Sequence, residues 1–185
     1  MRLFVALAPP PTALDELDAV VTPLRTGQPA LRWTSRDAWH ITLAFLGEVN
    51  EPAAARLGPR LERATARHHQ FSLAFAGAGA FPSAARARVF WGGLSGDDRA
   101  VASLAASVAA AARRAGARPP DDGRPFRPHL TLARCRVPAD TRALVATLSG
   151  YRGPAWTTDR VHLIHSRPSG QPRYAMLDSW PLARR

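Results

Sequence analysis

Two short segments of the sequence repeat one pattern, a histidine and a threonine separated by an aliphatic residue. They read HITL at residues 40–43 and HLTL at residues 129–132, and we call them the two tetrads. In a β-strand, residues i and i+2 point to the same face, so each tetrad places an imidazole beside a hydroxyl, about 7 Å apart. If the tetrads face each other, two histidines and two threonines meet at one site.

This set of side chains suits acid–base chemistry on an anionic group. An imidazole has an ordinary pKa near 6.5, so one of His40 and His129 can accept a proton while the other donates one. The hydroxyls of Thr42 and Thr131 can donate hydrogen bonds to oxygens held between the two rings, as in a phosphate.

Other kinds of catalytic site are not supported by the sequence. It contains no lysine, which excludes a P-loop of the form GxxxxGK[ST]. It lacks the HExxH and CxxC spacings of common zinc sites and the GxSxG turn of many serine hydrolases. We therefore expect no metal and no cofactor.

Charge and composition favour an anionic partner and a cytoplasmic protein. The chain of 185 residues carries a net charge of +11, and all 25 of its basic residues are arginine. Such a charge favours nucleic acid, although a composition rich in Ala, Arg, Gly and Pro equally fits GC-rich coding. A single cysteine, Cys135, excludes an intramolecular disulfide. No apolar run approaches the ~20 residues of a membrane span.

Apolar spacing predicts alternating strands and helices. Strands are expected at residues 3–8, 31–33, 39–46, 71–76, 88–94, 129–135, 157–166 and 173–180. Helices are expected at residues 11–24, 51–68, 97–115 and 140–148, with Asn50 as a cap, Gly116 as an end and a kink or split at Pro59. Residues 77–86, 118–128 and 167–172 are expected to be loops, and Gly47 to stop its strand.

This order predicts an α+β fold, because several strands follow one another without a crossover helix and must pair antiparallel. We expect one domain over residues 1–185, with two pseudo-symmetric sheet lobes at about 1–80 and 81–185 and helices outside. His40 and His129 are then expected on different sheets, facing a central cleft.

With their flanks, the tetrads resemble a known family. The blocks RLFVA at residues 2–6, WHITLAFLG at 39–47 and FRPHLTLAR at 126–134, together with Ser166 and a final strand containing Tyr174, resemble the 2H phosphoesterases. Within them, the similarity is to the RNA 2′,3′-cyclic phosphodiesterases, historically called 2′-5′ RNA ligases.

The resemblance implies a bilobal fold and metal-free hydrolysis of an RNA 2′,3′-cyclic phosphate to a 2′-phosphomonoester, with reversible 2′-5′ ligation as a further activity. It implies that His40 protonates the leaving O3′ and that His129 activates water. It also implies that Thr42 and Thr131 hold phosphate oxygens.

Two further residues follow the tetrads at an odd offset. By resemblance, Arg134 supports the phosphate or water and Phe45 stacks on a base. Each lies five positions after its histidine, which in an ideal strand is the opposite face. They join the site only if the strands bend or bulge; otherwise Phe45 is a plain core residue.

Two alternatives remain open at this point: a phosphodiesterase for a small cyclic nucleotide or cyclic phosphate, and a non-catalytic RNA-binding module. The expected partner is thus an RNA with a cyclic phosphate end or a small cyclic phosphate. We expect the protein to be a monomer and to have no membrane partner. The other histidines are interpreted as structural or solvated, and of His162 and His165 at most one can reach the cleft, because they point to opposite faces.

Overall fold

The structure is a computed structural model that describes residues 1–117, 125–167 and 172–184. Its helices are α1 (Pro11–Val21), α2 (Glu51–Thr65), α3 (Asp98–Ala115) and α4 (Arg142–Leu148), with short 3-10 turns at Thr22–Arg25, Arg36–Ala38 and Ala84–Arg86. Its strands are β1 (Arg2–Leu7), β2 (Leu31–Trp33), β3 (Ile41–Glu48), β4 (Phe71–Phe81), β5 (Ala87–Gly96), β6 (Leu130–Ala139), β7 (Trp156–Thr158), β8 (Arg160–Ser166) and β9 (Tyr174–Pro181). The α+β prediction is confirmed.

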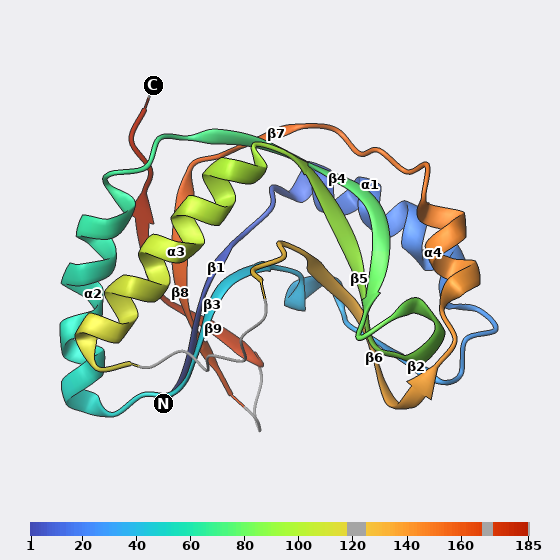
Figure 1. Cartoon of the computed structure of the whole chain (residues 1–185), viewed down its shortest axis with the longest axis horizontal. Helices are drawn as coiled ribbons and strands as arrows, with labels where there is room; N and C mark the ends of the chain where they lie inside the picture. The colour runs from blue at the N-terminus through green and yellow to red at the C-terminus, as the bar shows by residue number, and fades with distance from the viewer. Residues whose placement is uncertain (118–124, 168–171, 185) are drawn as a thin grey trace.

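All the strands belong to one curved sheet (Figure 1). Its order is β7-β4-β5-β6-β3-β1-β8-β9, with β2 paired to β6, and the paired strands are antiparallel. The prediction that His40 and His129 belong to different sheets is therefore wrong. The two halves are continuous because β3 and β6, which carry the tetrads, pair with each other.

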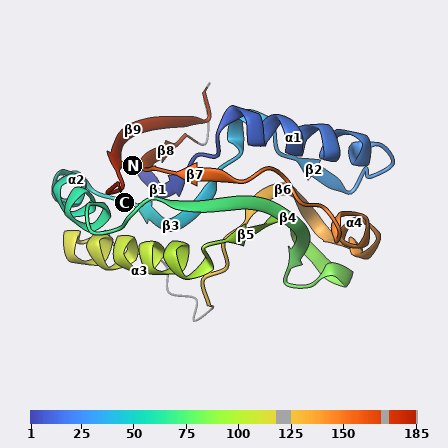
Figure 2. The same cartoon turned by 90° about the horizontal axis from the view of Figure 1, so that it is seen from above.

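Each half of the sheet nevertheless has its own hydrophobic core. In one half α2 and α3 cover β3, β1 and β8, and in the other α1 and α4 cover β4, β5 and β6. Figures 1 and 2 show these two pairs of helices at opposite ends of the molecule. The bilobal character thus lies in the two cores, not in two sheets.

The chain passes between these halves several times. After β1 it crosses to α1 and β2, returns for β3 and α2, crosses again to β4 and β5, and returns for α3. It then supplies β6, α4 and β7 to one half before β8 and β9 complete the other. The division at about residue 80 is therefore wrong as a boundary between halves, because each half combines early and late segments.

Helix termini follow the sequence closely. The side chain of Asn50 accepts a hydrogen bond from the backbone N–H of Ala53, as expected for the cap of α2. Helix α3 ends at Gly116, whose φ of 89° is in the left-handed region that glycine favours. Pro59 lies inside α2 without splitting it.

Some strand boundaries differ from the prediction. Strand β3 runs through Gly47 to Glu48, and β4 continues through residues 77–81, which were expected to be loop. The strand expected at residues 157–166 is two strands separated at Asp159; β7 pairs with β4 at one edge, and β8 pairs with β1 near the other. The loops expected at 118–128 and 167–172 lie partly outside the described residues. None of the helices described is long and apolar enough to cross a membrane.

Candidate active site

The two tetrad strands meet at the pair formed by Ile41 and Leu130. Ile41 is buried in one core and Leu130 in the other, so both point to the helical side of the sheet. The neighbours of this pair point to the opposite side, which we call the histidine face. Four half-buried side chains lie there: His40, Thr42, His129 and Thr131. Because the register is antiparallel, each histidine lies across from the threonine of the other tetrad.

Each imidazole interacts with a backbone group two residues before it in the chain. His129 Nδ1 lies 2.7 Å from the carbonyl oxygen of Arg127. A carbonyl can only accept, so Nδ1 donates this hydrogen bond and Nε2 is left for chemistry. His40 forms a hydrogen bond with the backbone of Ala38, which is also two residues before the ring. The interacting backbone group thus lies at the same sequence offset in both tetrads.

Aromatic rings enclose His40. The buried ring of Phe4 lies 4.6 Å from it, and the ring of Tyr174 lies 5.2 Å away and edge-on. Tyr174 also packs against Phe4, and the guanidinium of Arg173 lies 5.7 Å from the centre of the Tyr174 ring. These contacts limit the movement of the imidazole and exclude water from part of its surface.

His129 has a matching enclosure. Phe81 lies 5.0 Å from it and edge-on, and Trp91 lies 6.0 Å away. The guanidinium of Arg127 lies 5.4 Å from the centre of a Trp91 ring. Each histidine therefore lies beside two aromatic rings, one of which bears a stacked arginine, and the twofold pattern of the tetrads extends to their surroundings.

A β-bulge places Phe45 on the histidine face. Val5 pairs with Ala44 and Ala6 pairs with Thr42, so Leu43 is an extra residue in β3. The bulge changes the alternation, and Phe45 pairs with Phe4, which contacts His40. Phe45 is 52% exposed, so it is not a core residue.

An equivalent bulge places Arg134 on the same face. Trp91 pairs with Thr131 and Phe90 pairs with Ala133, so Leu132 is the extra residue in β6. The positive charge of Arg134 acts on both His40 and His129. Both bulges fall at the last residue of a tetrad. Each shifts the alternation of the strand by one residue, so the side chain five positions after the histidine lies on the histidine face.

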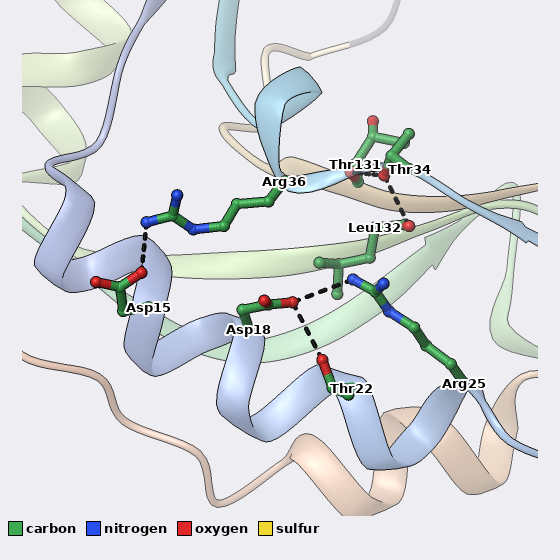
Figure 3. Close-up of polar contacts among 8 residues, drawn as sticks. All are labelled: Asp15, Asp18, Thr22, Arg25, Thr34, Arg36, Thr131 and Leu132. Atoms are coloured by element: carbon green, nitrogen blue, oxygen red, sulfur yellow. Dashed lines mark hydrogen bonds and ion pairs between the residues drawn. The ribbon is translucent and has the colours of Figure 1, made fainter.

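Thr34 holds the second bulge (Figure 3). Its hydroxyl is 2.8 Å from the carbonyl oxygen of Thr131 and 2.7 Å from that of Leu132, and its backbone N–H donates to Leu132 at 2.9 Å. These bonds tie the segment after β2 to the two residues of β6 at the bulge. Nearby, Arg36 forms an ion pair with Asp15, which ties the segment before β3 to α1.

Burial lowers the pKa of both catalytic candidates. The pKa of His40 falls from 6.5 to about 4, first because burial disfavours the charged ring; the bond to Ala38 opposes this, and the charges of Arg134 and His129 add to it. The pKa of His129 is also lowered by burial, against the bond to Arg127 and with the charges of Arg134 and Arg127. Both rings are therefore predominantly neutral at pH 7 in the free protein.

The late-strand histidines point to opposite faces, as predicted. His162 pairs with Ala6 on the histidine face, and His165 pairs with Leu3, which points into a core. His162 is buried, and its Nδ1 has no hydrogen-bond partner among the described residues.

The remaining candidates lie away from this site. His68 hydrogen-bonds to Ser107, and His69 Nδ1 is 3.3 Å from the carbonyl oxygen of Arg184. Cys135 is buried in a hydrophobic core. Across residues 1–117, 125–167 and 172–184, no group of three or more His, Cys, Asp or Glu side chains could hold a metal ion.

Sequence reasoning missed the aromatic enclosure and Thr34. Phe4 and Trp91 look like ordinary strand residues, and Phe81 falls in a segment that the sequence predicts to be a loop. The signal for Phe4 is its position in the first strand, where it points to the opposite face from its neighbours Leu3 and Val5. Nothing near Thr34 in the sequence indicates a bond to a strand almost a hundred residues later.

The sequence is similar to proteins of one family. Residues 9–169 match the model of the 2′-5′ RNA ligase superfamily. A relative from Aeropyrum pernix, named RNA 2′,3′-cyclic phosphodiesterase, is 37% identical over 123 residues, which are 66% of this chain and 67% of the relative. A relative of the same name from Escherichia coli is 30% identical over 187 residues, covering 98% of this chain and 96% of the relative.

Solved structures give the same answer for the fold. Escherichia coli LigT complexed with 3′-AMP superposes with a TM-score of 0.77 at 28% identity, covering 98% of this chain and 97% of that one. TT0787 of Thermus thermophilus superposes with a TM-score of 0.75 at 26% identity, covering 98% of both chains. The similarity includes both halves of the sheet.

Proposed function

Because the chain belongs to the 2′-5′ RNA ligase superfamily, we propose that it hydrolyses the 2′,3′-cyclic phosphate end of an RNA to a 2′-phosphomonoester. Relatives named RNA 2′,3′-cyclic phosphodiesterase support this activity. The observation that carries the proposal is the antiparallel pairing of the tetrads at Ile41 and Leu130, which gathers two imidazoles and two hydroxyls on one face.

In the proposed reaction, the oxygen of water forms a bond to phosphorus while the bond from phosphorus to O3′ breaks. His129 acts as the base, because its Nδ1 is occupied by the carbonyl oxygen of Arg127 and its Nε2 can take the proton of the water. His40 acts as the acid and gives a proton to O3′. Each transfer typically contributes 10²–10⁴-fold to the rate.

The anionic phosphate has donors on both sides. The hydroxyls of Thr42 and Thr131 donate to its non-bridging oxygens, and the guanidinium of Arg134 compensates the charge that develops on them. Since each threonine lies across from the histidine of the other tetrad, the phosphate binds near the middle of this group. The exposed ring of Phe45 offers a surface on which the terminal base stacks.

The substrate itself prepares His40 for its role. In the free protein this ring is neutral at pH 7, because its pKa is about 4. A bound phosphate anion favours the imidazolium and raises that pKa. The acid is therefore charged mainly in the complex, where its proton is needed.

The same two histidines can join two RNA ends when a 5′-hydroxyl takes the place of water. Its oxygen forms a bond to phosphorus while the bond to O3′ breaks, His129 takes the proton of the hydroxyl, and His40 gives a proton to O3′. In the reverse direction, cleavage of the 2′-5′ linkage, the acid and the base exchange roles. Reversible 2′-5′ ligation is therefore part of the proposal. One copy of the chain supplies both tetrads, which supports a monomer as the active form.

The test is incubation of the pure protein, in the presence of a chelator, with an oligoribonucleotide that bears a 2′,3′-cyclic phosphate. We expect conversion to the 2′-phosphomonoester without added metal. Resistance of the product to a 3′-specific phosphatase distinguishes it from the 3′-phosphate. Turnover that disappears on chelation and returns with a divalent ion would contradict the metal-free mechanism.

A further inference from the structure

Three arginines lie in a row on the histidine face, along strands β2 and β6. Arg32 pairs with Arg134 across the two strands, while the flanking pair Leu31 and Cys135 points into a core. Opposed residues of an antiparallel pair share a face, so Arg32 points to the same side as Arg134. Arg136 is two residues further along β6 and shares that side as well. We call Arg32, Arg134 and Arg136 the arginine row.

The outer end of this row opens into a surface hollow of about 390 Å³. It is lined by two of the arginines and by small or apolar residues: Arg32, Arg136, Pro29, Ala30 and Val137. Val137 is 74% exposed, which is unusual for an aliphatic side chain in a strand. Guanidinium groups beside an apolar surface match the two parts of a nucleotide, its phosphate and its base or ribose.

Two arginines of the row, Arg32 and Arg134, carry like charges at opposed positions of neighbouring strands. Like charges directly opposite each other, as in Arg32 and Arg134, destabilise a sheet. Within the described part of the chain, no carboxylate forms an ion pair with any of the three. The backbone of Arg136 is held by Arg88, which donates to its carbonyl oxygen at 2.6 Å. An external anion therefore relieves a repulsion that the fold retains.

We propose that the arginine row binds the phosphodiester backbone of RNA on the 5′ side of the cyclic end, so that an oligoribonucleotide is preferred over a cyclic mononucleotide. This proposal rests on the proposed function and identifies its substrate class. Arg134 contacts the terminal phosphate, and Arg32 and Arg136 contact the phosphate of the nucleotide before it. That nucleotide occupies the hollow, with its apolar part against Val137.

The spacing of the row agrees with this path. Arg134 and Arg136 are separated by about 7 Å along the strand, and Arg32 lies beside them on the next strand. An extended RNA strand that leaves the histidines along β6 therefore meets successive positive charges. The other arginine-lined hollow, about 420 Å³ between α2 and α3, is lined by Arg60, Arg63, Arg67 and Arg114. It lies with the helices on the other side of the sheet and cannot receive the same strand.

The test compares two substrates in the double variant Arg32→Ala/Arg136→Ala. One substrate is a 2′,3′-cyclic mononucleotide, and the other is a single-stranded oligoribonucleotide with the same terminal nucleotide. We expect KM for the oligoribonucleotide to rise about ten-fold for each arginine removed, with hydrolysis of the mononucleotide unchanged. The negative slope of log affinity against log salt concentration should become shallower by about 0.7 for each arginine removed.

The matched control is Arg63→Ala/Arg67→Ala, which removes the same charge from the α2–α3 hollow. It should leave the affinity for the oligoribonucleotide close to that of the parent protein. Equal losses in the two double variants, or no loss in the first, would overturn the proposal. Binding of the oligoribonucleotide is also measured by fluorescence anisotropy, so the row is tested even if neither substrate is hydrolysed. Absence of hydrolysis in the parent protein would reject the proposed function, whereas the binding data alone decide whether the row holds RNA.

Discussion

Ile41 and Leu130 form the pair at which the two tetrad strands join, and the four polar residues of the tetrads surround it. One side chain belongs to each hydrophobic core. The relative position of His40 and His129 is therefore set where the two cores meet. Any change that shifts one half of the sheet against the other alters the distance between acid and base before it unfolds either core.

Replacement of His40 or His129 by alanine should reduce kcat/KM by about 10²–10⁴-fold. Both side chains are only half-buried on the histidine face, so thermal unfolding should change little. The double variant should lose much less than the product of the two single losses, because the two rings act as a unit. Steady-state kinetics and thermal melts check this.

The assignment of acid and base is tested with a leaving group that needs no proton. On such a substrate the His40→Ala variant should recover activity, and the His129→Ala variant should not. Recovery by the second variant alone would exchange the roles. Recovery by neither, together with a rate that does not depend on pH, would remove acid–base catalysis from the mechanism.

The two pH profiles of the parent enzyme should differ. The profile of kcat/KM reports the free protein, in which burial lowers the pKa of both rings and that of His40 to about 4. Its bell should therefore lie below pH 6.5. The profile of kcat reports the complex, where the phosphate raises the pKa of His40, so its alkaline limb should lie at higher pH. Coincident alkaline limbs would show that the substrate does not charge this ring.

Thr34→Val should impair catalysis through the bulge in β6. Valine keeps the shape of the side chain but removes the hydroxyl that donates to the carbonyl oxygens of Thr131 and Leu132. We expect a loss of about 1–3 kcal/mol in the free energy of unfolding and a rise in KM, because Arg134 follows the bulge. The control is Thr147→Val, since that hydroxyl donates to Ala143 on the exposed face of α4; chemical denaturation and kinetics should show little change there.

Gly79→Ala should disturb the enclosure of His129. A Cβ at this position overlaps the ring of Trp91, which packs beside that histidine. We expect a loss of about 1–3 kcal/mol in stability from the overlap and a lower kcat. Gly150→Ala is the matched control, because its Cβ meets no atom within 4 Å. Equal kinetics for the two variants would contradict a positioning role for Trp91.

The tetrads were predictable because their chemistry depends on spacing within one strand. The positions of Phe45 and Arg134 were not, because the bulges at Leu43 and Leu132 are defined against partner strands β1 and β5. A bulge of this kind leaves no local composition signal, and both extra residues are ordinary leucines. Long-range pairing, not propensity, decides which face the later residues occupy.

The same limit explains the misplaced strand ends. The sequence predicts that a loop starts at Gly77. This residue, with φ of 64°, instead lies in an irregular step of the register with β5, and the strand then continues to Phe81. That continuation brings Phe81 to His129. Asp159 separates two strands that look like one, because β7 and β8 pair with strands far apart in the sheet.

The repeated crossing of the chain between the halves also constrains the order of folding during synthesis. The core around β1 and β3 is completed by residues that the ribosome delivers late: Val161, Leu163, Trp180 and Leu182. The other core needs β6 and α4, which also follow residue 129. A nascent chain that already contains the first tetrad therefore keeps its apolar strand faces uncovered until most of the protein has emerged. Such non-local closure slows folding and prolongs the period in which chaperones can act.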